Sequence, residues 1–438
     1  MDNILNKPDY SSSPVCIVTP RVSGMGGAQL YALRRIQFLK KKGIHAMLLV
    51  TDDTNFILEK QFGDVSILVR KDLAKPVFYY SDQNLDKIIH SICSDLHIFS
   101  QNLVLESHSL RLSIWCELIA SRLKCKHIIY PLNETSITSW EFNPVKDFFI
   151  WKQDRTELLG ASKPSLRVIL GRYYRESKAV YINIGFDPNE ITAISCPNIL
   201  GHFDKDSFKI GTISRLSKPY IEVLLNEVRW VAANNPLVRF TFIVAGDDVD
   251  RKIRKKLTKK YPSTPNMSIL FTGYLNPLGK DFFQGLDIYI GMATSVINSA
   301  ALKCASITVD PITSLSAGIF GITSKDTMFA SKEELRPIRY WLQKVITNSS
   351  LIEEARIAGH KHFMEEYNNE SCMTLIQSLI GQSSRTKDYF SFNKGYTSSF
   401  LLKKYFILEG SRFYSLLREF TGVVFPYNRI RSIFQRLF

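Results

Sequence analysis

Short apolar runs alternate with amphipathic stretches along most of the chain, and they set the first expectations about its fold. Residues 15–19 are largely apolar, which is typical of a buried strand in a parallel sheet. A glycine-rich turn occupies 23–27, a stretch with helical spacing covers 28–42, and residues 44–50 form a second apolar run. Strand, turn, helix and strand predict one right-handed βαβ unit.

The helix of this unit is predicted to be amphipathic. Ala32, Ile36 and Leu39 share one face, whereas Arg34 and Arg35 lie away from that face. Basic residues in the last turn and the glycine that follows them are typical of a helix end.

The alternation continues through the first half of the chain. It predicts strands at 103–105 and 127–130, weaker strands at 166–170 and 179–184, and a helix at 112–123. A polar, irregular segment from 195 to 207 follows, and we expect it to be an interdomain linker.

A second series of alternating elements begins after this linker. Its predicted strands lie at 209–213, 240–245, 269–271, 286–290 and 306–309, and its predicted helices at 221–233 and 296–302. Two parallel sheets in tandem predict an α/β fold with two Rossmann-like domains facing across a cleft, because ligands bind outside the carboxyl ends of such strands. We predict domains at 1–200 and 201–384, followed by an extension at 385–438.

Composition agrees with a globular, cytosolic protein. The 438 residues exceed one ordinary core, with 45% apolar and 22% charged residues. No apolar run of about 18 residues exists, and the N-terminus lacks the features of a secretory signal. Seven cysteines without C-x-x-C spacing indicate reduced, buried thiols rather than a metal or redox site.

The net charge of +15 favours anionic partners. The extension at 385–438 holds ten lysines or arginines against three acidic residues, and fourteen of its residues are Phe or Tyr. This composition fits a segment lying on an anionic membrane surface, and equally fits helices packed on the second domain with basic outer faces. Nucleic acid is not an expected partner, because the chain carries no helix-turn-helix, RNP or zinc-finger signature.

Three patches could bind a phosphate. The first is the glycine turn, since glycines allow close backbone approach and the following helix offers free N–H groups. Gln29 stands three positions after Gly26, so the turn does not match the dinucleotide fingerprint G-x-G-x-x-G. The alternative is a tight connection between strand and helix.

The other two patches follow predicted strands of the second domain. Arg215 and Lys218 are suited to a diphosphate, with a solvated loop as the alternative. Small residues at 291–301 lead into a helix N-terminus, where Thr294 or Ser295 could contact a phosphate or only cap the helix.

Several short motifs, in order, resemble retaining GT-B glycosyltransferases of the bacterial group 1 family. They are the Gly26-Gly27-Ala28 turn, the G-A-S at 160–162, the N-I-G-F-D at 183–187, the strand and R-L turn at 210–217, the I-V-A-G-D at 243–247, the F-T-G at 271–273, and the helix at 291–301. The resemblance covers about residues 15 to 380.

The resemblance implies a nucleotide-sugar donor mainly on the second domain and a glycan or lipid-linked acceptor mainly on the first. Arg215 and Lys218 would hold the diphosphate and neutralise the charge that develops as it leaves. The implied donor-binding residues are Gly26, Gly27, Gly246, Asp247, Gly273, Thr294, Ser295 and Asn298. Such enzymes generally retain anomeric configuration and require no metal or other cofactor, and no glycosidase-type carboxylate pair is placed here.

The chain departs from the family at its glutamate-containing helix. Asn298 stands where the family has the ribose-binding glutamate, Ile290 where it has the earlier glutamate, and Lys303 where it has the closing glycine. Glu134 and His108, each close after a predicted strand of the first domain, are further candidates for contacting sugar or acceptor, although a lone histidine is more often structural.

The leading hypothesis is a retaining glycosyltransferase that builds a surface polysaccharide or glycolipid, held on the cytosolic face of the inner membrane by its basic extension. The alternative is a degenerate relative that binds or scaffolds after losing its carboxylates.

Overall fold

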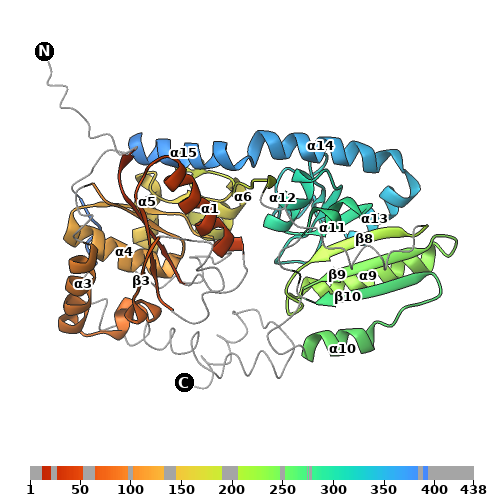
Figure 1. Cartoon of the computed structure of the whole chain (residues 1–438), viewed down its shortest axis with the longest axis horizontal. Helices are drawn as coiled ribbons and strands as arrows, with labels where there is room; N and C mark the ends of the chain where they lie inside the picture. The colour runs from red at the N-terminus through yellow and green to blue at the C-terminus, as the bar shows by residue number, and fades with distance from the viewer. Residues whose placement is uncertain are drawn as a thin grey trace, which may run out of the picture. The chain divides into compact units, whose positions relative to one another are not determined.

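A computed structural model describes residues 12–20, 27–52, 65–96, 102–132, 145–189, 206–246, 252–273, 275, 279–382 and 388–392. The contacts divide the chain into two compact units. Unit 1 comprises Met1–Gly24, Lys42–Leu158 and Ser384–Phe438, and unit 2 comprises Met25–Lys41 and Leu159–Ser383. Figure 1 shows the elements of each unit.

Unit 1 is built on a five-stranded parallel sheet of order β3-β2-β1-β4-β5. Its strands are β1 (Val15–Thr19), β2 (Ala46–Val50), β3 (Ser66–Val69), β4 (Val104–Ser107) and β5 (Lys126–Ile129). Its α-helices are α3 (Asp82–Leu96), α4 (Leu110–Leu123) and α5 (Val145–Asp154). The order reverses at β1 and β4, as in Rossmann-like sheets.

Unit 2 contains a six-stranded sheet of order β10-β9-β8-β11-β12-β13, parallel except for β13. Its strands are β8 (Phe208–Ile213), β9 (Phe240–Ala245), β10 (Met267–Gly273), β11 (Ile288–Gly291), β12 (Ser306–Thr308) and β13 (Gly318–Ile319). A separate parallel pair joins β6 (Leu159–Gly160) to β7 (Val180–Tyr181).

Helices cover both faces of the unit 2 sheet. On one face α9 (Tyr220–Asn234) and α13 (Ile338–Thr347) bury apolar residues against the strands, and α10 (Lys252–Lys260) adds Leu257. On the other face lie α11 (Lys280–Gln284), α12 (Thr294–Ala301) and α14 (Ser350–Glu366). The two apolar clusters make this unit a three-layer α/β structure, which confirms the predicted fold class.

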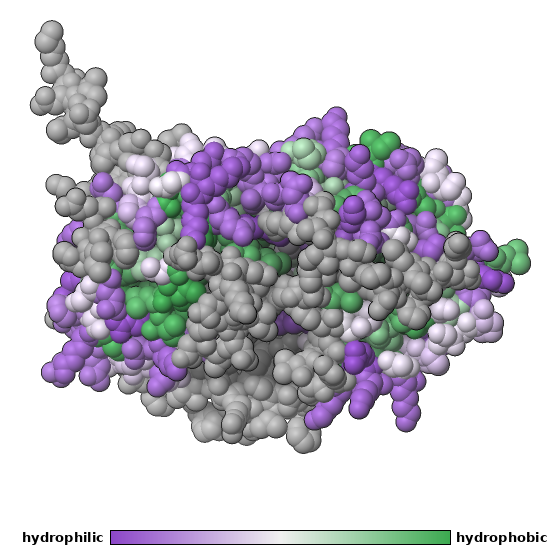
Figure 2. Space-filling view, viewed as in Figure 1, coloured by the Kyte–Doolittle hydropathy of each residue, from purple (hydrophilic) through white to green (hydrophobic). Residues whose placement is uncertain are grey.

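Three further helices belong to unit 2: α1 (Gly27–Lys41), α6 (Lys163–Leu170) and α15 (Asn369–Gln382). Figure 2 shows hydrophilic side chains along the outer side of α14 and α15.

The arginines of α1, predicted to lie away from the apolar face of an amphipathic helix, are buried as well. Arg34 and Arg35 are 3% and 0% exposed. Arg34 donates to the carbonyl of Gly185 at 3.3 Å and lies over the ring of Phe186 at 4.8 Å. Arg35 donates to the side-chain oxygen of Gln377 on α15 at 3.0 Å. These buried contacts explain why α1 groups with unit 2.

The prediction of a strand at 166–170 is also wrong, because these residues end helix α6. Ser162 caps this helix: its hydroxyl accepts from the N–H of Ser165 at 3.2 Å, and the Ser165 hydroxyl receives the N–H of Ser162 at 2.9 Å. A proline in the first turn adds a second start signal. These local signals start a helix where the apolar run at 166–170 was predicted to be a strand.

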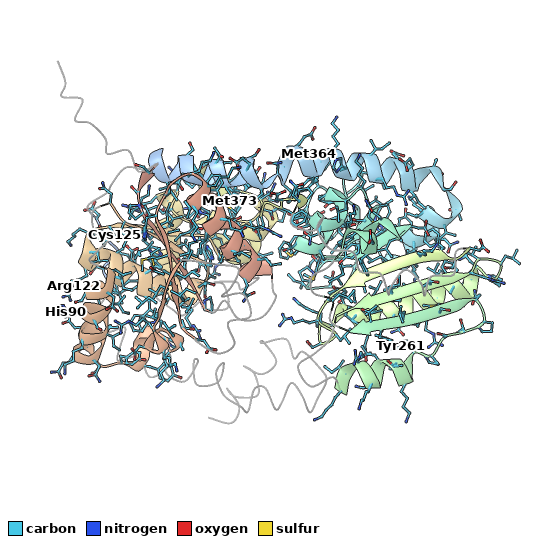
Figure 3. All side chains as sticks on the ribbon, viewed as in Figure 1. His90, Arg122, Cys125, Tyr261, Met364 and Met373 are labelled. Atoms are coloured by element: carbon cyan, nitrogen blue, oxygen red, sulfur yellow. The ribbon has the colours of Figure 1, made fainter. Side chains whose placement is uncertain are left out.

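The described part of the extension, residues 388–392, packs on unit 1. The Tyr389 hydroxyl donates to the carbonyl of Cys125, which Figure 3 labels, at 3.0 Å. The rings of Phe390 and Phe392 lie 5.5 and 5.3 Å from that of Phe148. The rest of the extension and most of the predicted linker lie outside the described residues.

Candidate functional site

The candidate donor site lies at the carboxyl edge of the unit 2 sheet, where β8, β9, β10 and β11 end. The N–H of Ser214, after β8, donates to the carbonyl of Ala245 at 2.9 Å. The N–H of Gly246, after β9, donates to Gly273 at 2.8 Å. The four predicted segments therefore end at one edge, as carboxyl ends of neighbouring parallel strands must.

Gly246 has no room for a side chain at this edge. Its φ is +135°, and a Cβ atom there would lie 1.8 Å from the carbonyl oxygen of Ser214. Close backbone approach therefore requires glycine at this position.

Arg215 and Lys218 occupy the short turn between β8 and α9. The N–H of Lys218 donates to the carbonyl of Arg215 at 3.1 Å, which closes the turn. Arg215 is exposed and Lys218 is half-buried. Within the described ranges no carboxylate forms an ion pair with either cation, so both charges remain available at the strand ends.

Helix α12 begins at the same edge, directly after β11. Ala293, its N-cap residue, adopts φ +54°, and its N–H donates to the carbonyl of Thr327 at 3.0 Å. A left-handed alanine is uncommon, so the surrounding bonds must hold this turn. The neighbouring Asp326 carboxylate accepts the N–H groups of Met328 and Phe329 at 2.8 and 2.7 Å and thereby shapes the supporting loop.

Tyr289, which the sequence did not single out, ties β8 to the start of α12. Its buried hydroxyl accepts the N–H of Ile213 at 3.2 Å, and Tyr289 packs in the same apolar cluster as Val296 and Ile297 of α12. Burial raises the pKa of this phenol well above its ordinary value. No spacing rule identifies such a residue, because a tyrosine within an apolar strand is indistinguishable from ordinary core.

One face of α12 remains polar. Asn298 lies four positions after Thr294 and three after Ser295, and all three are half-buried, whereas the opposite face packs into the core. The Asn298 side-chain oxygen is buried and has no hydrogen-bond partner among the described residues. Ile290, at the place of the family's earlier glutamate, is 0% exposed within the apolar core.

The first residue of α1 lies beside the first residue of α12. A Cβ atom on Gly27 would lie 2.7 Å from the Thr294 hydroxyl oxygen. The N-termini of two helices, each with free N–H groups, thus come together within unit 2. Gly26, Asp247 and Glu134, the remaining candidates, lie outside the described residues.

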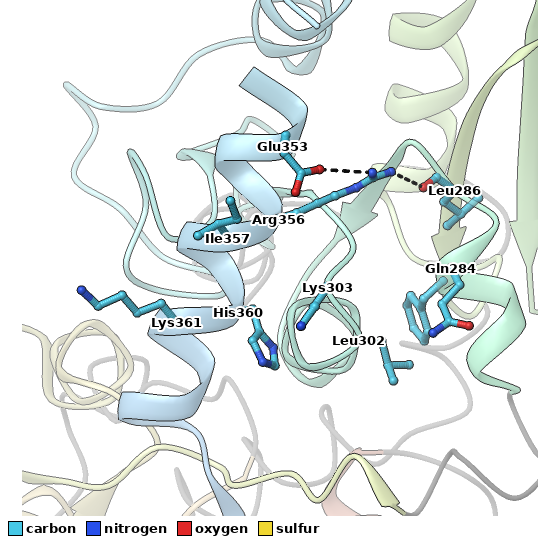
Figure 4. Close-up of a pocket in the computed structure, with 10 residues that line it drawn as sticks. Gln284, Leu286, Leu302, Lys303, Glu353, Arg356, Ile357, His360 and Lys361 are labelled. Atoms are coloured by element: carbon cyan, nitrogen blue, oxygen red, sulfur yellow. Dashed lines mark hydrogen bonds and ion pairs between the residues drawn. The ribbon is translucent and has the colours of Figure 1, made fainter. Parts of the chain in front are cut away.

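The other end of α12 closes on Lys303. Its φ is +58°, its N–H donates to Ala300 at 3.1 Å, and the N–H of Cys304 donates to Ser299 at 2.9 Å. This is a Schellman ending, in which the family's glycine would be unstrained. A cavity of about 570 Å³ adjoins Lys303, between α12 and α14, and Figure 4 shows Arg356 and His360 on its wall. The cavity lies at the opposite end of α12 from Thr294 and Ser295.

The carboxyl edge of the unit 1 sheet is arranged differently. The fully buried side chains of His108 and Glu106 pair at 3.0 Å. Burial and this bond favour the structural alternative for His108.

A second buried network lies beside β5. The Glu117 carboxylate pairs with the His127 ring at 2.8 Å and the Lys152 ammonium at 2.8 Å, and accepts the N–H of Phe390 at 3.0 Å. Lys152 also pairs with Glu157 at 2.8 Å.

The protonation states in this network follow from its contacts. Burial acts to raise the pKa of Glu117, but the Lys152 charge and the bonds from His127 and Lys152 outweigh it and lower that pKa to about 2. Burial and the Lys152 charge lower the pKa of His127 to about 4. At neutral pH the network therefore holds Glu117 as a carboxylate and His127 as a neutral imidazole.

Within the part of the chain that the structure describes, no group of three or more His, Cys, Asp or Glu side chains could hold a metal ion. Likewise, no helix among the described residues is long and apolar enough to cross a membrane. The described cysteines, of which Cys196 is not one, are free and buried.

No protein-family model matches the chain, and no curated protein matches it in sequence. Solved structures do match its fold. Anabaena HepE, solved with UDP and glucose, matches with a TM-score of 0.61 and 13% identity, covering 84% of this chain and 100% of HepE.

Two further structures agree with this match. The sucrose-phosphate synthase of Thermosynechococcus elongatus matches with a TM-score of 0.57 and 11% identity over 84% of this chain and 98% of its own. TarM of S. aureus, solved with UDP among its ligands, matches with a TM-score of 0.57 and 11% identity over 84% and 100%. The two-sheet α/β fold of this chain is that of the GT-B glycosyltransferases.

Proposed function

We propose that this chain is a retaining glycosyltransferase that moves a sugar from a nucleotide-diphosphate sugar to a glycan or lipid-linked acceptor. The observation that carries the proposal is the carboxyl edge of the unit 2 sheet. There Gly246, the cations Arg215 and Lys218, and the polar start of α12 each follow a strand that ends at the same edge.

This edge fits a diphosphate leaving group. Arg215 offers a planar fork and Lys218 a compact charge, and neither is neutralised by a carboxylate of the described residues. As the bond from the anomeric carbon to the diphosphate breaks, negative charge builds on the departing oxygen, and both cations stabilise it. Free N–H groups at the start of α12 add to the same field.

Structures with the same fold support the donor class. HepE was solved with UDP-glucose and TarM with UDP, and one trehalose-6-phosphate synthase structure addresses glycosyl transfer with retention. We therefore propose a UDP-sugar as the first donor to test, with Gly27 and Thr294 near the phosphates and Asn298 near the ribose.

We also propose which domain binds the acceptor and where in the cell the reaction takes place. From the family resemblance, we expect the first domain to bind most of the acceptor, with Glu134 contacting its hydroxyls. From the positive charge of residues 385–438, we expect a peripheral position on the inner membrane.

The test is donor hydrolysis and transfer with a panel of UDP- and GDP-sugars. Arg215→Ala and Lys218→Ala should each lower turnover by about 100-fold, the usual effect of removing one preorganised charge-stabilising group. Lys332→Ala, an exposed cation on the same unit, is the matched control and should leave turnover unchanged. Unchanged turnover in both site variants would exclude this diphosphate site.

One observation favours the alternative, a degenerate relative that binds without catalysis. Ile290 is sealed in the core, so no carboxylate occupies the place of the family's earlier glutamate. Calorimetry separates the two functions. UDP binding without turnover indicates a binding protein, whereas no binding of any nucleoside diphosphate excludes both catalysis and donor binding at this edge.

A further inference from the structure

Helix α10, on unit 2, carries an unusual concentration of positive charge. Its nine residues include six lysines or arginines and no acidic residue. Lys252, Lys255, Lys256 and Lys259 stand at positions i, i+3, i+4 and i+7, so they form one stripe along the helix, and all four are exposed.

The opposite side of α10 attaches the helix to the unit 2 core. Leu257 is 1% exposed and Ile253 packs on the same apolar cluster. Tyr261, which follows the helix and is labelled in Figure 3, is buried and donates its hydroxyl to Asn226 at 3.0 Å. Lys260 pairs with Glu222 at 3.0 Å. The stripe therefore points away from the sheet, and Figure 2 shows a hydrophilic patch where Figure 1 places α10.

The lysine stripe destabilises α10 as long as no anionic partner covers it. Lysines three and four positions apart repel one another and destabilise the helix. The exposed side of α14 does the reverse, pairing Arg356 with Glu353 and Lys361 with Glu365. In the described ranges no ion pair neutralises Lys255, Lys256 or Lys259.

We propose that the lysine stripe of α10 docks unit 2 on an anionic membrane surface. Lysine provides compact charges suited to a layer of anionic headgroups, and the stripe has neither arginine forks nor exposed aromatic rings for reading or stacking bases. The apolar side of α10 is already buried, so the contact is electrostatic and involves no insertion. This surface is distinct from residues 385–438 and does not depend on the proposed transfer activity.

The test is flotation of the full chain with vesicles of phosphatidylcholine alone or with about 30% phosphatidylglycerol, at low and high salt. The test variant carries Lys→Gln at 252, 255, 256 and 259, which preserves helix propensity and relieves repulsion. Each lysine near such a surface contributes about five-fold to partitioning, so loss of all four should lower binding to anionic vesicles at least ten-fold.

The matched control carries Lys→Gln at the dispersed, exposed positions Lys87, Lys178, Lys332 and Lys361, with the same change in net charge. It should lower vesicle binding by less than about three-fold, because screening limits charges away from the contact. Thermal unfolding verifies that both variants fold.

An equal loss in both variants, or no loss in the test variant, overturns the proposal. Loss of binding to a short DNA duplex with unchanged vesicle binding also overturns it and assigns the stripe to nucleic acid.

Discussion

The carboxyl edges of the two sheets differ in the burial of their charged side chains, which are buried and paired in unit 1 but include an exposed cation in unit 2. At the unit 1 edge, the buried side chains of Glu106 and His108 pair with each other, and in a second buried network beside β5 Glu117 pairs with Lys152. At the unit 2 edge, Arg215 is exposed without a carboxylate partner among the described residues. Buried pairs are already satisfied and have little to offer a ligand, whereas an unpaired cation on a rigid strand end can bind an anion.

The largest expected effect concerns the paired side of this comparison. Glu117→Ala would remove one of the two carboxylates that pair with the buried Lys152 among the described residues and would leave the N–H of Phe390 without its acceptor. Removing one partner of a buried pair typically costs about 3–5 kcal/mol, so thermal or denaturant unfolding should show a large loss of stability. Glu370→Ala, which removes the exposed ion pair with Lys41, is the control and should cost below about 1 kcal/mol. Similar losses in both variants would contradict the contrast.

Acid should weaken unit 1 through the same network. The folded-state pKa values of Glu117 and His127, about 2 and 4, lie below their ordinary values of 4.5 and 6.5, so the unfolded chain binds protons more readily. The His127 contribution is present above pH 6.5 and lost as pH falls toward 4. That of Glu117 is present above pH 4.5 and lost toward pH 2. Urea unfolding of the wild type and of Glu117→Gln across this pH range measures how the free energy of unfolding changes with pH. If that free energy changes equally with pH in both proteins, Glu117 does not contribute to the loss of stability in acid.

A smaller effect is expected where unit 2 lacks a carboxylate. Asn298→Glu should tighten binding of UDP about five-fold, because a charged acceptor on the ribose hydroxyls exceeds a neutral one by roughly 1 kcal/mol. Asn298→Gln, which has the same length without the charge, should not improve binding. Calorimetry compares the three proteins, and equal affinities would show that Asn298 does not face the nucleotide.

The smallest effect concerns the other end of α12. Lys303→Gly should stabilise the protein by up to about 1 kcal/mol, since glycine adopts φ +58° without strain. Lys303→Ala, which removes the same charge but keeps a Cβ atom, separates backbone strain from electrostatics. Glycine and alanine variants of equal melting temperature would contradict the strain argument.

Much of the architecture was accessible from local pattern alone. Apolar runs at β1, β8, β9 and β11 and the helical spacing of α4, α9 and α12 predicted two parallel sheets, because sheet burial imposes continuous apolar strands. The strand prediction failed at α6, where the capping residues Ser162 and Ser165 and a proline in the first turn start a helix. The short strand β3 lies at the sheet edge and was missed, since its partial exposure gives a weak pattern.

The candidate site was only half accessible in this way. Arg215, Lys218 and Thr294 were found because each follows a predicted strand, and chain order places strand ends at one edge. Tyr289 was missed, since its role depends on a hydrogen bond from Ile213, which is distant in sequence. Asp326 bonds within its own loop, and its importance is visible only because the neighbouring Thr327 carbonyl accepts the N–H of Ala293 at the start of α12.

By itself, the sequence determined the alternation of strands and helices and the position of cations and glycines after strands, because both follow from short-range periodicity and backbone geometry. Only the tertiary structure decided which charged side chains are buried or paired and which stay exposed. Arg34 and Arg35 became buried contacts of α1, His108 joined Glu106, and Arg215 stayed exposed. The physical reason is that the energy of a charge depends on its burial and on partners far along the chain.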